Sequence, residues 1–242
     1  QKLHHWQSLS LSYLYLGESY RRLNNFDRSL QELEKGLQIA HKKKLSIIKH
    51  RLLNGKAVLL KKVQNYKASK KILINVLDKI NTNETELAYT YNALAGIYFR
   101  QEKNKDSSTY FYKKGIDLAE KTNNNYLKTI ILPNYSDLLL EKGQYKLALK
   151  YLKEAEKIAY NIHDYTGSFF INSSIATYHH YKKDYEKTIQ FYKIALNDYG
   201  KYADINQIAN LYWQLSGALY SNGQYEEGFV YQDKLIYLKD SL

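Results

Sequence analysis

Paired histidines and paired carboxylates are the residues of this chain that come nearest to a metal-binding or catalytic pattern. His4-His5 and His179-His180 are adjacent in sequence. Adjacent helical positions point about 100° apart, so neither pair can readily chelate one metal ion. Glu226-Glu227, and Glu32 with Glu34, lie in stretches with the pattern of exposed helix faces. Catalytic carboxylates need opposing positions across a pocket, and no such arrangement is indicated.

Other catalytic signatures are missing from the sequence. It contains no glycine-rich phosphate loop, no strand-turn-helix context for a nucleophile and no His-Glu zinc helix motif. Cysteine is absent, which excludes disulfides, thiolate metal sites and a cysteine nucleophile. We therefore expect a protein that is not an enzyme, with no catalytic residue, no metal and no cofactor.

The formal net charge of +12 raises the question of nucleic-acid binding, because lysines neutralise phosphates and release counterions. The lysines, however, are spread over the whole chain and alternate with glutamates, as in residues 150–157. That pattern is typical of solvated helix faces. We expect no nucleic-acid binding by this chain.

Membrane and export signals are also missing from the sequence. The most apolar run, Thr129 to Leu140, is interrupted by Pro133, Asn134 and Asp137, and it is shorter than the roughly 18 residues of a membrane helix. Gln1 opens directly into a helical pattern, without a signal peptide. We interpret the sequence as a fragment of a longer protein.

The elements that position every side chain are repeats of one unit, seen most clearly in Leu138 to Ala159. This stretch ends one helix, turns at Lys142-Gly143-Gln144 and begins an amphipathic second helix at Tyr145. Six copies align with successive spacings of 40, 39, 40, 40 and 40 residues, on Phe26, Tyr66, Lys105, Tyr145, Tyr185 and Tyr225. A small residue follows three positions later in each copy: Ser29, Ser69, Ser108, Ala148, Thr188 and Gly228. A fixed period of this length predicts an array of helical repeats.

The copies span the chain without a linker. We place the repeats at residues 9–43, 46–80, 85–122, 126–161, 164–199 and 205–242. No stretch between them is rich enough in proline, glycine or serine to separate domains. We therefore predict one continuous domain over residues 1–242.

Leu16, Gly17 and Tyr20, followed by Phe26, Ser29 and Gly36, resemble the signature positions of a tetratricopeptide repeat. Leu94 to Tyr98 and Ser216 to Leu235 are weaker copies, and Leu235 departs from the small residue usual at its position. The resemblance implies an all-α fold, a right-handed superhelical solenoid of about six helix-turn-helix repeats. The period near 40 exceeds the 34 of the standard repeat and resembles the long-helix subgroup.

In this family the first helices line a concave groove that binds a protein or peptide. By that resemblance the ends of the first helices would supply the ligand-binding residues, with basic side chains in the first half of the chain and mostly aromatic ones in the second: Arg21, Arg22, Lys61, Lys62, Arg100, His180, Tyr181, Trp213 and Tyr220. Charge would steer an acidic segment while an aromatic anchor is buried.

The final residues, Tyr237 to Leu242, are similar to the closing phrase of the last repeat in membrane-bound bacterial histidine kinases and transcriptional regulators. The resemblance implies a periplasmic sensor region, with a membrane span and an output domain outside the fragment. A homodimer is one assembly that such a region allows. The alternative is a cytoplasmic scaffold or peptide-responsive regulator that mediates protein-protein interaction.

Overall fold

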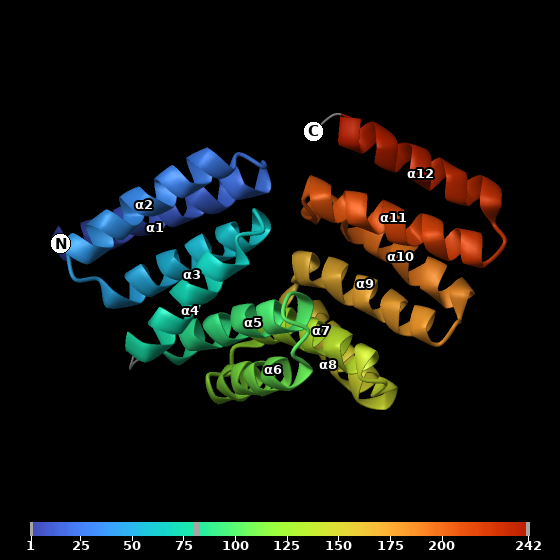
Figure 1. The fold of residues 1–242 in the computed structure, drawn as a ribbon, viewed down its shortest axis with the longest axis horizontal. Coiled ribbons are helices and arrows are strands. Elements are labelled where there is room, and N and C mark those ends of the chain that lie inside the picture. Colours follow the sequence, from blue (N-terminus) through green and yellow to red (C-terminus); the bar gives the residue numbers. More distant parts are fainter. Residues whose placement is uncertain (1, 80–82, 241–242) are drawn as a thin grey trace. The chain divides into compact units, whose positions relative to one another are not determined.

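The structure is a computed structural model that describes residues 2–79 and 83–240. In that part of the chain it contains twelve α-helices, one short 3-10 helix and no strand (Figure 1). Successive helices pack pairwise and antiparallel, as helix-turn-helix repeats require. The predicted all-α solenoid of helix pairs is confirmed.

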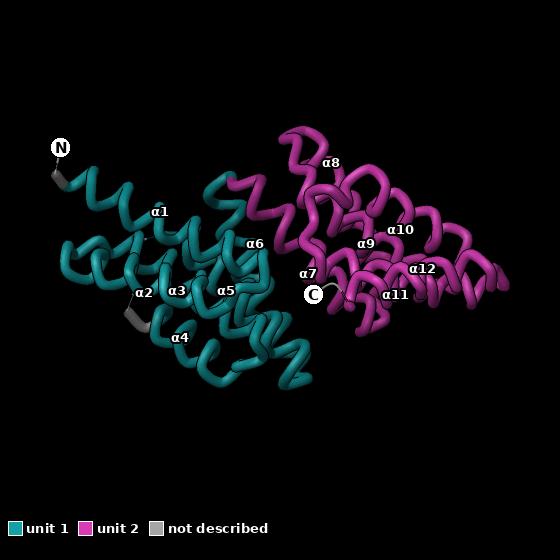
Figure 2. Tube along the Cα trace, turned by 90° about the horizontal axis from the view of Figure 1, so that it is seen from above, with its two compact units in different colours: residues 1–123 teal, residues 124–242 magenta. Residues whose placement is uncertain are grey.

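The chain divides into two compact units, Gln1–Asn123 and Asn124–Leu242, which Figure 2 colours separately. Unit 1 holds α1 (Lys2–Arg22), α2 (Phe26–Lys42), α3 (Ser46–Lys62), α4 (Tyr66–Lys79), α5 (Glu84–Arg100) and α6 (Lys105–Lys121). Unit 2 holds α7 (Asn125–Glu141), α8 (Tyr145–Ile162), α9 (Tyr165–Tyr181), α10 (Tyr185–Tyr199), the 3-10 helix η1 (Gly200–Tyr202), α11 (Ile205–Ser221) and α12 (Tyr225–Asp240). The prediction of one continuous domain stays a prediction.

The second helix of every repeat begins at the residue on which the sequence copies align. These helices start at Phe26, Tyr66, Lys105, Tyr145, Tyr185 and Tyr225. The residue two positions before each of these helices adopts a left-handed conformation, with φ of 71° at Gly143 and 58° at Asn24. This conformation closes the first helix and reverses the chain, and Asn, Gln or Lys adopts it where glycine is absent.

A buried serine fastens the two helices of each repeat in unit 1. The hydroxyls of Ser29, Ser69 and Ser108 donate hydrogen bonds to the main-chain oxygens of Gly17, Ala57 and Ala95, at 2.7, 2.8 and 2.9 Å respectively. The small residue that recurs three positions into the second helix therefore fixes the register of that helix against the first.

We expect Ser69→Ala to lower the free energy of unfolding of unit 1 by about 1 kcal/mol, because one buried hydrogen bond is lost. Urea denaturation measures the change. Ser19→Ala is the matched control, since the Ser19 hydroxyl bonds the Tyr15 main-chain oxygen of its own exposed helix. An equal loss in both variants would contradict the role given to Ser69.

The first and last helices carry polar residues at positions that are buried elsewhere. The register of Ser12 is filled in later first helices by Leu52, Thr90, Ile131, Ile171 and Leu211, which are all fully or almost fully buried. The register of Gln232 is filled in earlier second helices by Leu33, Leu73, Tyr112, Leu152 and Tyr192. Ser12 and Gln232 are both exposed. The same faces also carry exposed apolar side chains, Leu16 beside Ser12 and Phe229 and Ile236 beside Gln232, so they are only partly polar.

Candidate functional site

The basic candidates lie in the last turns of three neighbouring helices in unit 1. Arg21 and Arg22 end α1, Lys61 and Lys62 end α3, and Arg100 ends α5. Helix α3 packs against both α1 and α5. The last turns of the three first helices therefore form a row of cationic side chains.

Lys61 is the centre of this row. Burial lowers the pKa of its ammonium group, and the positive charges of Arg100 and Arg21 lower that pKa further. The Lys61 residue itself is exposed to solvent. We define Arg21, Lys61 and Arg100 as the basic cluster, because both arginine charges act on the Lys61 ammonium group.

Glu18 borders the basic cluster from α1. Burial raises the pKa of its carboxyl group, while the charges of Arg21 and Arg22 oppose that rise. The one acid therefore offsets only part of the positive charge. The negative ends of the α1, α3 and α5 dipoles help to hold the cations in place.

A buried polar network lies deeper between α3 and α5, and the sequence analysis did not foresee it. Thr90 Oγ1 lies 3.0 Å from His50 Nε2 and 3.0 Å from Asn54 Oδ1. Asn54 Nδ2 donates to the Glu86 main-chain oxygen at 3.2 Å, and Arg51 pairs with the Glu86 carboxylate. Burial raises the pKa of Glu86, and the Arg51 hydrogen bond and charge oppose that rise. The network fixes the packing of the two helices that carry Lys61 and Arg100.

The aromatic candidates belong to unit 2 and are mostly paired with neighbouring rings. The ring centroids of His180 and Tyr185 are 5.6 Å apart, and those of Tyr181 and Tyr145 are 6.3 Å apart. Tyr220 stacks on Tyr225 at 6.4 Å, and its hydroxyl donates to Gln232 Oε1 at 2.7 Å. Trp213 is different, since 64% of its surface is exposed. Among the candidates of unit 2, Trp213 is therefore the side chain best placed to enter a partner.

The nine candidates are thus divided between the two units. Unit 1 brings Arg21, Lys61 and Arg100 together, with Arg22 and Lys62 beside them. Unit 2 holds His180, Tyr181, Trp213 and Tyr220. One groove shared by both sets stays a prediction.

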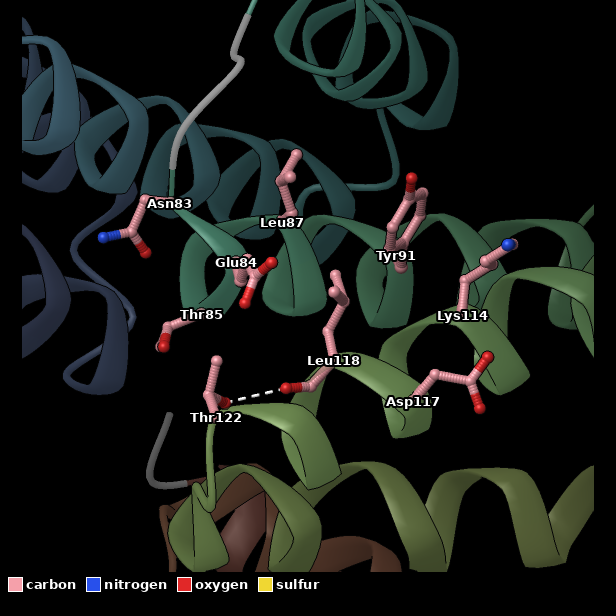
Figure 3. Close-up of a pocket in the computed structure, with 9 residues that line it drawn as sticks. All are labelled: Asn83, Glu84, Thr85, Leu87, Tyr91, Lys114, Asp117, Leu118 and Thr122. Atoms are coloured by element: carbon pink, nitrogen blue, oxygen red, sulfur yellow. Dashed lines mark hydrogen bonds between the residues drawn. The ribbon is translucent and has the colours of Figure 1, made fainter.

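A pocket of about 560 Å³ lies between α5 and α6 of unit 1 (Figure 3). Its lining includes Glu84, Asp117, Lys114 and Tyr91. Glu84 forms an ion pair with Lys121, and Tyr91 stacks on Phe111 with 5.9 Å between ring centroids. The pocket contains both signs of charge, and one of its two carboxylates already has a partner.

Residues 2–79 and 83–240 contain no cluster of three or more histidine, aspartate or glutamate side chains placed to hold a metal ion. None of the helices formed by these residues combines the length and the apolar character needed to cross a membrane.

Comparison with solved structures identifies known proteins that share the fold. No family model matches this sequence, and no curated protein was found to be similar. BtubC from P. vanneervenii superposes with a TM-score of 0.62 at 13% identity, covering 98% of this chain and 91% of that one. PilF of Pseudomonas aeruginosa gives 0.60 at 14%, covering 97% and 94%. PilW, a type IV pilus biogenesis factor, gives 0.59 at 16%, covering 93% and 91%.

The chain has a tetratricopeptide-like fold. The likeness extends over 98% and 97% of this chain in the first two of these comparisons. At these identities the likeness concerns the fold alone.

Proposed function

We propose that this tetratricopeptide-like chain is a non-enzymatic protein-interaction module that binds an acidic peptide or protein segment at the basic cluster of unit 1. The observation that carries the proposal is that Arg21, Lys61 and Arg100 lie in the last turns of three helices of unit 1 that pack side by side, close enough for the arginine charges to lower the pKa of Lys61. Like charges placed in this way repel one another, and a bound carboxylate relieves that repulsion.

The spacing of the basic cluster favours an extended acidic segment over a single small anion. The three cations come from three successive first helices, which pack about 10 Å apart in helical arrays. A segment with several carboxylates can contact all of them. An exposed aromatic side chain such as Trp213 supplies a second kind of contact, because a tryptophan buries a large apolar area when it enters a partner.

We expect the triple variant Arg21→Ala, Lys61→Ala, Arg100→Ala to bind acidic peptides at least about tenfold more weakly, since three charge-assisted contacts are removed. The probes are fluorescein-labelled ten-residue peptides that contain zero, two, four or six glutamates. Fluorescence anisotropy gives the dissociation constants. Affinity for the unmodified protein should rise with the number of glutamates and fall with added salt.

The matched control is Lys42→Ala, Lys71→Ala, Lys113→Ala, which removes the same charge from exposed positions of unit 1. It should leave peptide affinity nearly unchanged. Equal weakening in both triple variants would mean that net charge alone attracts the peptides, and the proposed site would be wrong. Far-UV circular dichroism checks that both variants keep their helices.

We further propose that the chain is the sensor region of a membrane-bound bacterial signalling protein, located outside the cytoplasm. The resemblance of Tyr237 to Leu242 to the closing phrase of such sensors supports this; Ser241 and Leu242 lie outside the described residues. Tyr237 is 79% exposed on α12, where a following element or partner has access. A solenoid responds to a ligand by small changes of curvature, and α12 would pass such a change onward.

The full-length coding sequence tests the sensor role. An export signal before Gln1, and a membrane span followed by kinase or DNA-binding motifs after Leu242, would support it. Termination soon after Leu242 without an export signal would contradict it and favour a cytoplasmic scaffold.

A further inference from the structure

A second pocket lies in unit 2, between the second helices α8 and α10 and over the first helix α9. Its volume is about 580 Å³, within the range of pockets that hold small molecules. The lining comprises Lys153, Glu156, Lys157, Ala159, Tyr160, His163, Tyr165, Ser168, Ile171, Asn172, Phe191, Ile194 and Tyr199. Every lining residue belongs to unit 2.

At two positions of this pocket, one repeat has small polar residues where the others have larger ones. The register of Asn172 is filled in the other five first helices by Tyr13, Leu53, Tyr91, Leu132 and Tyr212. The register of Ser168, one helical turn earlier, is filled by Leu9, Lys49, Leu87, Lys128 and Ile208. Both replacements fall on the same face of α9 and leave more room there than the larger side chains do. The pocket of unit 1 has Leu87 and Tyr91 at these two registers, whereas the pocket of unit 2 has a hydroxyl and an amide.

The two small residues also give the pocket hydrogen-bond acceptors. Asn172 Nδ2 donates to the Ser168 main-chain oxygen, and the Ser168 hydroxyl donates to the Asp164 main-chain oxygen, both at 2.9 Å. Neither Asn172 Oδ1 nor Ser168 Oγ accepts a hydrogen bond from any residue that the structure describes. Asn172 is only 6% exposed. An amide oxygen that lacks a protein partner and belongs to a residue lining the pocket favours a ligand that brings an N–H or O–H donor.

Several aromatic residues line the pocket, and two of them stack on rings outside the lining. Phe191 stacks on His179 with ring centroids 5.4 Å apart and an interplanar angle of 7°. Tyr165 stacks on Tyr202 at 4.9 Å and 15°. Tyr199 and Tyr160 complete the aromatic lining. Rings fixed in this way offer flat apolar surfaces at little entropic cost, which suits a planar ring.

Lys153 and Lys157 lie one helical turn apart on α8 and give the pocket a cationic side. Neither ammonium group forms an ion pair within residues 2–79 and 83–240. Glu156 lies beside them, so the local charge is a single positive surplus. That surplus favours one anionic group on the ligand.

We propose that this pocket binds a small planar-ring ligand that carries a hydrogen-bond donor and one anionic group, with Asn172 accepting the hydrogen bond and Lys153 and Lys157 facing the anion. The site is separate from the basic cluster, and nothing in the proposed peptide binding requires it. Loss of one function therefore leaves the other measurable.

The probe is 1-anilinonaphthalene-8-sulfonate, which combines aromatic rings, an N–H donor and a sulfonate. We expect saturable binding of one equivalent, followed by fluorescence enhancement. Asn172→Tyr restores the kind of ring that three other repeats carry at this register and should weaken binding by about tenfold or more while the fold is kept. Asn172→Leu, which matches the remaining two repeats, should give the same result.

The lysines are tested by Lys153→Ala, Lys157→Ala, which should weaken binding about fivefold at low salt and much less at high salt. Lys146→Ala, Lys150→Ala is the matched control, because these exposed lysines share α8 and the same spacing but do not line the pocket. The proposal is overturned if the probe binds without saturation, or if Asn172→Tyr and Asn172→Leu bind it as well as the unmodified protein.

Two competitors distinguish the sources of the same ligand chemistry. Indole-3-acetate represents aromatic carboxylates and adenosine 5′-monophosphate represents nucleotides, and each carries a planar ring, an N–H donor and an anion. We expect at least one to displace the probe from the unmodified protein. If neither displaces it at millimolar concentration, the pocket does not recognise this class and the proposal is wrong.

Discussion

Replacing Leu33 by alanine is expected to lower the free energy of unfolding of unit 1 by about 4 kcal/mol, near the upper end for such a change. Leu33 is 1% exposed and lies in the core cluster that joins α1, α2 and α3. A Cβ atom added to Gly17 would lie 2.8 Å from Leu33 Cγ, and one added to Gly55 would lie 3.3 Å from Leu33 Cδ2. The leucine thus packs directly on two glycine backbones. Because glycine has no side chain to move, the cavity left by alanine cannot collapse.

Tryptophan fluorescence can follow the unfolding of unit 1 separately. The chain has two tryptophans, and Trp6 packs against the core cluster of unit 1 while Trp213 belongs to unit 2. In a Trp213→Phe background, the urea-dependent emission of Trp6 reports the stability around Leu33. Leu30→Ala is the control on the same helix, since Leu30 is 36% exposed and should cost well under half as much. Similar losses in the two variants would contradict the packing given to Leu33.

The positions of the second helices could be predicted from the sequence because local and long-range signals agree there. Each turn, and the small residue three positions into the following helix, marks the same point in six copies, and the helices begin at those points. Left-handed turn residues such as Gln64 and Lys183 do not disturb the prediction, because the repeat period predicts the helix starts whichever residue occupies the turn.

The basic cluster was accessible to the sequence analysis for the same reason. Arg21 and Lys61 share one register, and the longer turn of the third repeat places Arg100 one position further along. Equal register on packed helices puts side chains next to each other. The lowering of the Lys61 pKa also depends on how many protein atoms surround the ammonium group, and no sequence pattern gives that number.

The sequence alone did not predict features that depend on side-chain volume or on hydrogen bonds among several residues. The pocket around Asn172 has two side chains that are smaller than those of the other repeats, and only a comparison of all six repeats at one register reveals them. The network of His50, Asn54 and Thr90 joins residues of two repeats whose polar character has no local explanation. The division into two units has no marker such as a proline- or glycine-rich linker between residues 121 and 126.

The stability of unit 1 is expected to fall as the pH falls from about 6.5 towards 4, because His50 must be neutral in the folded protein. Burial lowers the pKa of His50 from 6.5 to about 4, and the side chain is 0% exposed. Thr90 has one hydroxyl hydrogen, which it donates to Asn54 Oδ1 or to the Glu86 main-chain oxygen. His50 Nε2 therefore carries the proton that is donated to Thr90, and Nδ1 has no partner among the described residues.

The sign and size of the effect follow from proton linkage. The unfolded chain takes up a proton on this histidine below about pH 6.5, whereas the folded chain does so only near pH 4. Stability from the neutral histidine is thus complete above pH 6.5 and is lost on acidification, by about 1 kcal/mol at pH 5.5 and about 3 kcal/mol at pH 4. Glu86 has a raised pKa and acts in the opposite direction at and above its usual titration range, where the folded protein binds the proton more readily than the unfolded chain. A variant that lacks His50 but keeps Glu86 separates the two contributions.

Urea denaturation of unit 1 at pH 7.0, 6.5, 6.0 and 5.5, followed by Trp6 emission in the Trp213→Phe background, measures this dependence. His50→Leu should be much less sensitive to pH over this interval, whatever its stability at pH 7, because the titrating group is gone. His41→Leu is the control in the same unit: His41 is exposed near the end of α2, and its removal should leave the pH dependence unchanged. If His50→Leu kept the full pH dependence, another group would have to take up the proton, and a neutral, buried His50 would not be the cause.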